Sequence, residues 1–402
     1  MRPFQHTIPL AEARAHLTAA VRPLTRTDTV PLGELSGRVV ARHVVAGANV
    51  PPFSRAMMDG YAVLAGDTTD ATRDRPRALI QVGRVFTGEV MTRPVTAGEC
   101  VEIATGAPLP PGVDAVVMVE ETAPGADGHV HVLAPVHSGQ HVGRAGADIA
   151  AGAHVLRIGD VLLPARVGVV AALGLQALDV YARPRVAIVS TGNEVVAPGS
   201  PLGPGQIYDV NRHTLSAVVR AHGGEPVAFD VAADTLDALD AAVDRALGCD
   251  LVVFSGGSSV GDRDLVLDIL TRRGTVVFHG IATRPGKPTA FGRIGDVPVF
   301  GMPGNPTSCL TNAYVLLVPF LRALARLPAH QPRVVTVPLA RRVGSHVGRT
   351  QFYTVRLAEG GAEPAFKASG DITSMAHADG YIEIASDVAA IEAGAPVDVV
   401  LF

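Results

Sequence analysis

The chain has 402 residues, of which 34 are basic and 38 are acidic, so its formal net charge is −4 at pH 7. That balance supplies no broad cationic field and argues against nucleic acid as a partner. The length exceeds the size at which one hydrophobic core keeps growing, and apolar residues make up 48% of the chain. We therefore expect roughly two to four domains, each with its own core.

The cysteines and the N-terminal segment both indicate the cellular compartment in which the protein resides. Cys100, Cys249 and Cys309 are far apart and form no CxxC pair, which disfavours a disulfide framework and a structural zinc site. The first residues, MRPFQHTIPLAEARAHL, lack the continuous apolar run of a signal peptide, and Pro164 and Arg166 interrupt the longest apolar stretch. We expect a cytoplasmic protein without a membrane span.

The predicted elements change type along the chain. Residues 9–24 carry apolar side chains at helical spacing, and a turn-rich crossing follows. Short apolar runs between about 50 and 145, such as ALIQVGRVF and AVVMVEE, are typical of strands. From 183 to about 327, strands such as VAIVS and LVVF alternate with amphipathic segments, which predicts a parallel sheet with helices on both faces. A helix over about 306–324 precedes runs such as FYTVRLA and VDVVLF, which indicate a small all-β module.

The most informative segment is SGGSSVGDRD at 255–264, directly after the apolar strand LVVF. Small residues there let backbone N–H groups approach an anion, and the following helix adds the positive end of its dipole. Asp262 and Asp264 beside such a phosphate cradle favour a bridging cation such as Mg²⁺. Two alternatives stay open: the turn is plain structural punctuation, and the aspartates only cap the helix.

Two further turns carry polar residues. The segment TRPGKPTAFG at 283–292 presents Arg284 and Lys287 on a proline-stiffened turn, which suits a small oxyanion. An ordinary exposed turn with solvated basic residues is an equally open interpretation. In GMPGNPTSC, Asn305 is a natural N-cap and Pro306 suits the first turn of a helix, so that segment alone indicates structure.

Three acidic residues stand in turns. Asp59 lies in PPFSRAMMDGYAV and Asp148 in GADIAAG, while Glu194 in STGNEV follows a strand at the carboxyl edge, where open α/β sheets bind ligands. Each taken alone is more often a turn or cap residue than a ligand. His213 and His279 lack partner spacing, so we interpret them mainly as structural.

Taken together, these segments resemble one known family nearly end to end. The chain resembles MoeA-type molybdopterin molybdenumtransferases and the E domain of gephyrin in PPFSRAMMDGYAV, EIATGAPLPPGVDAVVMVEE, GADI, STGNEV, GQIYDVNRHTL, SGGSSVGDRD, RPGKPTAFG and GMPGNPTSC. The resemblance implies a multidomain α/β fold. Its predicted parts are a split N-terminal helical domain (1–48 and 145–180), a β-rich insert (49–144), a doubly wound molybdopterin-binding domain (181–328) and a C-terminal β-barrel (329–402).

The same resemblance implies an activity. In that family, adenylylated molybdopterin receives molybdate at its dithiolene, and the phosphoanhydride is hydrolysed to release AMP and molybdenum cofactor, with Mg²⁺ assisting. It also implies a homodimer whose active site is shared between protomers, with transient contacts to other cofactor-assembly proteins. Neither nucleic acid nor a membrane is expected as a partner.

The resemblance assigns roles to individual residues. The pterin-nucleotide cradle comprises Ser255, Gly256, Gly257 and Ser258. The carboxylates of the same cleft are Glu194, Asp234 and Asp264, of which Glu194 and Asp264 are the expected metal ligands. The opposite protomer contributes Asp59, Thr105, Arg144 and Asp148. The molybdate-proximal turn carries Arg284, Lys287 and Pro288, with Arg349 and Ser374 nearby. The five carboxylates Asp59, Asp148, Glu194, Asp234 and Asp264 are the predicted catalytic residues.

Two positions depart from the family pattern. Several relatives carry a lysine where this chain has Gly280, and some place an arginine where it has Thr354. Arg349 and Arg356 are the candidates to compensate for the second change.

Two other functions compete with this prediction. The α/β segment alone also resembles molybdopterin adenylyltransferases, which transfer AMP from ATP, but the large segments before it argue against that activity. A receptor-anchoring module is the second alternative, because gephyrin's E domain anchors membrane receptors through its dimer. No extended linker or second enzyme domain supports scaffolding here.

Overall fold

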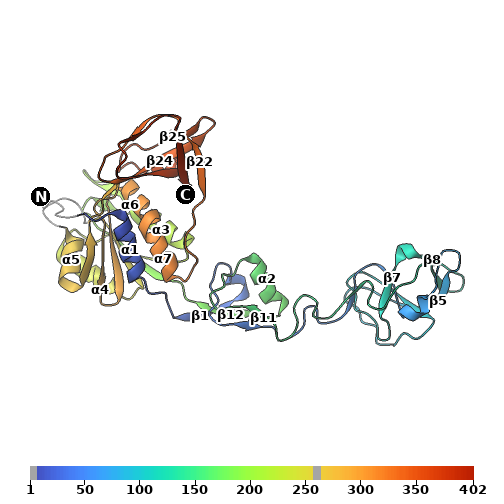
Figure 1. Cartoon of the computed structure of the whole chain (residues 1–402). Coiled ribbons are helices and arrows are strands. Elements are labelled where there is room, and N and C mark those ends of the chain that lie inside the picture. Colours follow the sequence, from blue (N-terminus) through green and yellow to red (C-terminus); the bar gives the residue numbers. More distant parts are fainter. Residues whose placement is uncertain (1–6, 257–263) are drawn as a thin grey trace. The chain divides into compact units, whose positions relative to one another are not determined.

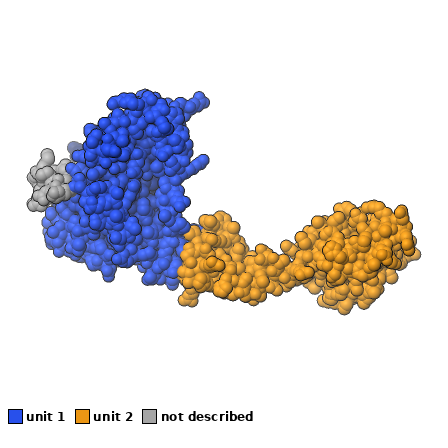
Figure 2. All heavy atoms as spheres, viewed as in Figure 1, with its two compact units in different colours: residues 1–28, 37–39, 180–402 blue, residues 29–36, 40–179 orange. Residues whose placement is uncertain are grey.

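The computed structural model describes residues 7–256 and 264–402 of the chain. It consists of two compact units, shown in different colours in Figure 2. The first unit comprises residues 1–28, 37–39 and 180–402, and the second comprises residues 29–36 and 40–179.

A mixed sheet forms the centre of the first unit, with the strand order β16-β13-β17-β21-β20-β18. Its strands are β13 (Arg185–Ser190), β16 (Glu225–Ala228), β17 (Leu251–Ser255), β18 (Thr275–His279), β20 (Ala290–Ile294) and β21 (Val297–Met302). The predicted parallel pairing is confirmed for β16, β13, β17 and β21. It is wrong for β20, which pairs antiparallel with both of its neighbours, β21 and β18, because only Gly295 and Asp296 connect β20 to β21 and so short a loop forces a hairpin. Strand β18 again runs in the direction of the parallel strands.

Helices cover both faces of this sheet (Figure 1). They are α1 (Leu10–Ala20), α3 (Asn211–Ala221), α4 (Leu236–Ala246), α5 (Leu265–Arg273), α6 (Pro306–Asn312), the π-helical turn η4 (Ala313–Leu317) and α7 (Val318–Leu324). Successive residues of β13 enter different cores: Val186 packs with α1, α3 and α7, whereas Ala187 packs with α4 and α5. This alternation follows from the strand period of two, and it confirms the doubly wound arrangement.

Helix α1 belongs to the α/β unit. Its buried residues Leu10, Ala13 and Leu17 join the same apolar cluster as Val186 and Leu321. We predicted from sequence that residues 1–48 form one helical domain with 145–180, and the structure separates this helix from the remainder of that segment. Helical periodicity identifies the apolar face of a helix but does not indicate the core against which that face packs.

The helix over Pro306–Leu324, predicted from sequence, is the one described segment long and apolar enough to cross a membrane. However, 72% of its most apolar window is buried inside the protein. Phe320 and Leu321 pack in the cluster that includes Phe291 and Phe300 of the sheet. We therefore interpret the segment as a core helix.

The C-terminal part of the first unit is a β-module. Its described elements are β19 (Thr283–Arg284), β22 (Val334–Pro338), β23 (Val343–Gly344), β24 (Thr350–Ala358), β25 (Gly361–Pro364), α8 (Thr373–Ala376), β26 (Gly380–Ile384), β27 (Ala390–Ile391) and β28 (Pro396–Leu401). The strand order is β19-β24-β26-β28-β22, with β25 also paired to β24. A bridge from Leu339, just after β22, to Ala362 of β25 closes this order on itself, as expected for a barrel. A separate parallel pair, β14 (Val195–Val196) and β15 (Ile207–Tyr208), lies beyond the central sheet.

The second unit contains the predicted β-rich segment. Its main sheet has the order β7-β4-β6-β5-β9-β8. The strands are β4 (Gly60–Val63), β5 (Arg77–Val85), β6 (Glu99–Ile103), β7 (Ala115–Met118), β8 (Thr122–Pro124) and β9 (His129–Val132). The short elements are β2 (Val44–Val45) with β11 (His154–Leu156), β3 (Arg55–Ala56) with β10 (Val142–Gly143), the 3₁₀ turns η1 (Leu32–Glu34), η2 (Ala65–Thr68) and η3 (Val119–Glu121), and the helix α2 (Pro164–Ala172). The paired strands β1 (Thr27–Pro31) and β12 (Ala177–Tyr181) contain residues of both units.

Residues 1–48 and 145–180, which we predicted as a helical domain, contain the α-helices α1 and α2 in their described part. In the second unit, whose residues are all described, α2 is the one α-helix, and short strand pairs make up much of the surrounding structure. The other domain boundaries stay a prediction.

His222 follows α3 in a half-buried site. Its ring meets that of His330 edge to face, with centroids 5.1 Å apart. Burial lowers the pKa of His222 to about 4, with the charges of His330 and Arg322 as smaller causes. An unfolded histidine titrates near 6.5, so protons bind the unfolded chain better. The stability contributed by neutral His222 is present above about pH 6.5 and is lost as the pH falls toward 4.

A pH-dependent difference in stability is therefore expected. Between about pH 7 and pH 5, the wild type should lose about 1–2 kcal/mol more unfolding free energy than His222→Gln, a value reduced for the partial exposure of the ring. Urea unfolding at both pH values measures this difference. His346→Gln, which changes an exposed histidine, is the control and should match the wild type. An equal loss in wild type and His222→Gln would contradict the assignment.

Candidate active site

The carboxyl ends of the parallel strands define a ligand-binding edge. Ser190 at the end of β13 lies in register with Ser255 at the end of β17. Because β16 and β17 lie on opposite sides of β13, this is a topological switch point, where open α/β sheets bind ligands. Ser190 is 2% exposed, and its Oγ has no hydrogen-bond partner among the residues that the structure describes. Its hydroxyl group is thus available at the base of this edge.

The turn after β17 begins as we predicted for a phosphate cradle. Gly256 has φ 96°, and a Cβ atom there would overlap the carbonyl oxygen of Thr191, so glycine is required. Asn211, at the start of α3, donates one hydrogen bond to Ser255 Oγ (2.7 Å) and another to Gly304 O (2.7 Å). These bonds fix the start of the cradle. Gly257, Ser258 and Asp262 lie outside the described residues.

Two predicted carboxylates lie against the turn that follows β13. Thr191 donates from its amide to Ser255 O (2.9 Å) and from its hydroxyl to Asp234 Oδ1 (3.2 Å). Glu194 folds back over Gly192, where a Cβ atom would lie 2.8 Å from the Glu194 carboxylate oxygens. Glu194 and Asp234 are both exposed. The structure therefore brings both side chains to the carboxyl edge where Ser255 lies.

Asp264 has two partners. Its Oδ1 accepts a hydrogen bond from Leu267 N (3.0 Å), which caps α5, and its Oδ2 lies 2.8 Å from His279 Nε2 on β18. Asp264 therefore does cap the helix, whereas its predicted metal role stays a prediction. His279 joins the site as the partner of Asp264.

The fit of Mg²⁺ depends on these carboxylates. Hard carboxylate oxygens are ligands that Mg²⁺ accepts, and Glu194 is exposed for that purpose. Both Asp264 oxygens already accept N–H groups but keep further lone pairs. Within the described ranges, no group of three or more His, Cys, Asp or Glu side chains is arranged to hold a metal. Mg²⁺ commonly takes most of its ligands from substrate phosphates and water, so one or two protein carboxylates are chemically compatible with it, and the Mg²⁺ site stays a prediction.

A buried asparagine side chain holds the turn that carries Arg284 and Lys287. Asn312 of α6 is 1% exposed and donates to Gly286 O (2.8 Å) and to Thr289 Oγ1 (2.6 Å). A side chain at Gly286 would overlap the Asn312 amide, and its φ of 99° also favours glycine. Arg284 and Lys287 are half-buried. Stiffness thus comes from a buried amide as well as from the prolines.

The C-terminal module approaches this turn through β24. Thr283 pairs with Thr350, and Thr350 N donates to Ala282 O (2.9 Å), so the exposed Arg349 lies next to the turn. Ser374 is fully buried, and its hydroxyl accepts from Lys367 N (3.0 Å). The structure thus places Ser374 inside the 367–374 loop and not on its surface.

That loop also contacts the start of α6. Asn305 precedes the helix as predicted, but its side chain makes no cap hydrogen bond. Instead, its amide donates to Ser369 Oγ (3.0 Å). Asn305 therefore occupies the predicted N-cap position, but its side chain contacts the C-terminal module and makes no hydrogen bond to the helix.

In the second unit, the four predicted residues occupy connected loops. Asp59 Oδ1 accepts from Thr105 N (2.7 Å), and Thr105, through its amide and then its hydroxyl, holds the pKa of Asp59 below its usual value. Loop 141–149 is tied to loop 50–57 by hydrogen bonds from Met57 N to His141 O (2.9 Å) and from Asp148 N to Val50 O (3.1 Å). Asp59, Thr105, Arg144 and Asp148 are all exposed.

Comparison with known proteins covers most of the chain. Residues 8–174 match the family model "MoeA N-terminal region (domain I and II)", residues 187–323 match "Probable molybdopterin binding domain", and residues 336–402 match "MoeA C-terminal region (domain IV)". The chain belongs to the MoeA family.

Relatives and solved structures agree with this membership. Molybdopterin molybdenumtransferase 2 of Mycobacterium tuberculosis is 38% identical over 405 residues, which covers 96% of each chain. Molybdopterin molybdenumtransferase of Haemophilus influenzae is 33% identical over 352 residues and 86% of each chain. The crystal structure of the molybdopterin biosynthesis MoeA protein from Pyrococcus horikoshii has a TM-score of 0.86 at 38% identity and covers 98% of this chain and 99% of its own.

The two departures from the MoeA pattern have local structural settings. Gly280 has φ 93°, a conformation that favours glycine over lysine. Thr354 is 2% exposed and its Oγ1 has no partner in the described part of the chain, so this position faces the interior. Arg356 is paired with Glu363 at 2.5 Å. Arg349, which is exposed beside the 283–292 turn, is thus better placed than Arg356 to compensate.

Five residues of this site escaped prediction as site residues: Ser190, Thr191, Asn211, His279 and Asn312. Thr191 and Asn211 lie in the segments STGNEV and GQIYDVNRHTL, so a signal was present. Ser190 and Asn312 are buried polar residues in apolar runs, and nothing in the sequence alone indicates their partners.

Proposed function

We propose that the chain is a molybdopterin molybdenumtransferase, which inserts molybdate into adenylylated molybdopterin and releases AMP and molybdenum cofactor. The relatives that share this name cover nearly the whole chain. The observation that carries the proposal is the pairing of two features at one edge of the first unit. A glycine turn begins at Ser255 and Gly256 on the switch point, and a separate locked turn presents Arg284 and Lys287.

The two turns suit two different anions. Backbone N–H groups of the glycine- and serine-rich segment that begins at Ser255 bind the phosphates of the pterin nucleotide, because small residues before a helix let N–H groups approach an anion. Arg284 and Lys287 hold the tetrahedral molybdate dianion, since preorganised cations lose little freedom on binding it. The hydroxyl of Ser190 and the amide of Asn211 complete the floor of the cleft.

The carboxylates act on the phosphoanhydride. Glu194 and Asp234 lie at the cradle edge, where a carboxylate can orient the water that attacks phosphorus and accept its proton. His279 holds Asp264 in place through the 2.8 Å contact. We propose that Glu194 and Asp264 hold Mg²⁺ when it is bound, and this ion supplies neutralisation of phosphate charge.

Metal removal should therefore abolish turnover. Carboxylates that face a phosphoanhydride repel it unless a cation intervenes, so excess chelator should stop AMP release and added Mg²⁺ should restore it. Initial rates of AMP release measure both steps. Circular dichroism of the chelated protein is the control and should be unchanged. Full turnover in excess chelator would remove the metal from the proposal.

We also propose a cytoplasmic homodimer with shared sites. Asp59, Thr105, Arg144 and Asp148 are exposed polar residues of the second unit, and the lowered pKa of Asp59 keeps it charged. Exposed residues of this kind suit completion of an active site contributed by the second protomer. Transient contact with other cofactor-assembly proteins fits the handover of substrate and product.

The direct test is substrate consumption. Purified protein is incubated with adenylylated molybdopterin and molybdate, and AMP and molybdenum cofactor are measured. We expect stoichiometric release of both that depends on molybdate. Consumption of ATP with unadenylylated molybdopterin, without any need for molybdate, would instead identify an adenylyltransferase.

A further inference from the structure

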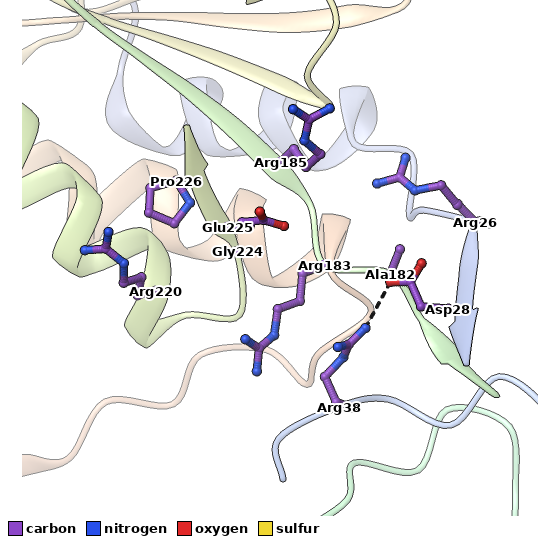
Figure 3. Close-up of a pocket in the computed structure, with 10 residues that line it drawn as sticks. All are labelled: Arg26, Asp28, Arg38, Ala182, Arg183, Arg185, Arg220, Gly224, Glu225 and Pro226. Atoms are coloured by element: carbon purple, nitrogen blue, oxygen red, sulfur yellow. Dashed lines mark hydrogen bonds and ion pairs between the residues drawn. The ribbon is translucent and has the colours of Figure 1, made fainter. Parts of the chain in front are cut away.

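Arginines surround a hollow of about 430 Å³ on the first unit, away from the predicted site residues (Figure 3). The described arginines that line it are Arg26, Arg38, Arg183, Arg185 and Arg220. Two carboxylates, Asp28 and Glu225, also line it. The five guanidinium groups outnumber the two carboxylates, so the hollow is cationic.

The hollow lies at the opposite edge of the sheet from the candidate active site. Arg185 and Glu225 are the first residues of the parallel strands β13 and β16. Ser190, which marks the active-site edge, ends β13 five steps further on, or about 16 Å at the usual rise per residue. The two sites are therefore separate.

Part of the arginine cluster is held in place by ion pairs. Arg26 binds Asp250 through two hydrogen bonds, of 3.0 and 3.1 Å, and Asp250 also accepts from Arg185 N (2.8 Å). Arg38 donates to Asp28 (3.2 Å) and to Tyr181 O (3.2 Å), and its side chain is only 10% exposed. These arginines are thus positioned before any ligand binds.

The remaining arginines of the cluster carry positive charge that no described carboxylate pairs with. Arg183 and Arg220 are exposed, and neither makes an ion pair with any residue in the described ranges. Glu225 likewise has no ion-pair partner within the described residues, although it lies in the same hollow. Figure 3 shows its carboxylate among the arginine side chains. No ion pair within the described residues therefore neutralises the guanidinium groups of Arg183 and Arg220.

We propose that this hollow binds a small anion that carries a diphosphate group. Arginine presents a planar fork of donors that matches phosphate oxygens, and several such forks on one hollow favour a ligand with more than one phosphate. The volume exceeds that of a single orthophosphate, and no aromatic side chain lines the hollow. Recognition therefore depends on charge, and the source is either free pyrophosphate or the diphosphate of a nucleotide.

Titration calorimetry with inorganic pyrophosphate tests the proposal on the full chain. The double variant Arg183→Ala/Arg220→Ala should bind roughly tenfold more weakly or worse, since two charge-assisted contacts are lost. Arg333→Ala/Arg341→Ala removes two exposed arginines of the C-terminal module and should bind like the wild type. Glu225→Gln should bind more tightly, because it removes a negative charge from the hollow.

Pyrophosphate can also bind at the candidate active site, so each titration is repeated in an Arg284→Ala/Lys287→Ala background. Persistence of the Arg183 and Arg220 effect there supports the separate site. Orthophosphate should bind more weakly than pyrophosphate. ADP binding as tight as pyrophosphate identifies a nucleotide source, and weaker ADP binding identifies the free anion. Pyrophosphate affinity unchanged by Arg183→Ala/Arg220→Ala, or equal affinity for orthophosphate, would overturn the proposal.

Discussion

Exchange of Asp59 for asparagine is expected to lower turnover by roughly a hundredfold or more without disturbing the fold. Asparagine keeps the oxygen that accepts the hydrogen bond from Thr105 N (2.7 Å) but removes the negative charge. That charge is otherwise secure, because Thr105 lowers the pKa of Asp59. AMP release measures turnover, and size-exclusion chromatography measures whether the proposed dimer is present in wild type and variant alike.

The same variant tests whether sites are shared between protomers. Asp59→Asn mixed with Asp264→Asn forms heterodimers in which one of the two sites contains neither substitution. Because random exchange in a twofold dimer makes half of the population heterodimeric, about a quarter of wild-type turnover should return. Asparagine at 264 also keeps an acceptor for Leu267 N, so α5 retains its cap.

The matched control is Asp59→Asn mixed with Asp148→Asn. Both residues lie on the same unit of one chain, so every shared site in such a heterodimer retains one substitution. No turnover should return from this mixture. Recovery in both mixtures, or in neither after demonstrated subunit exchange, would contradict a site built from Asp59 of one protomer and Asp264 of the other.

Much of the fold was predictable because its central strands contain uninterrupted runs of buried apolar residues. Strand β17 is buried at every position from Leu251 to Ser255, and such an apolar run before a glycine turn is typical of a central strand. The antiparallel edge was missed, although Gly295 and Asp296 form a two-residue connection of the hairpin type. The docking of α1 was not predictable, since amphipathic spacing indicates a buried face without naming its partner.

The parts of the candidate site that lie in glycine-rich turns were predictable, because their backbone conformation depends on the residues of the turn itself. Gly256 and Gly286 have positive φ and close neighbours, so the glycine-rich turns around them carry their own signal. The support of these turns was not predictable. Asn312 lies 26 residues from Gly286 along the chain, and His279 lies 15 residues from Asp264. Such contacts depend on tertiary packing, which no short motif records.

Arg284→Ala and Lys287→Ala are expected to weaken molybdate use selectively. The reason is geometric, because Asn312 holds the turn through Gly286 O and Thr289 Oγ1, and neither substitution removes these hydrogen bonds. Loss of one charge-assisted contact costs about 1.5–3 kcal/mol, or roughly ten- to a hundredfold in affinity. Since the backbone at Gly280 favours glycine over a further cation, the double variant should approach inactivity.

The measurement is the initial rate against molybdate concentration at saturating adenylylated molybdopterin, beside direct binding of that substrate. Binding of the substrate should stay near the wild-type value, because the pterin nucleotide depends on the separate turn that begins at Gly256. Arg341→Ala, at an exposed position of the C-terminal module, controls for loss of general positive charge and should leave both quantities unchanged. If substrate binding collapses while the molybdate dependence is unchanged, the cleft does not contain two separate anion sites, and the cations of the 283–292 turn serve the phosphates instead.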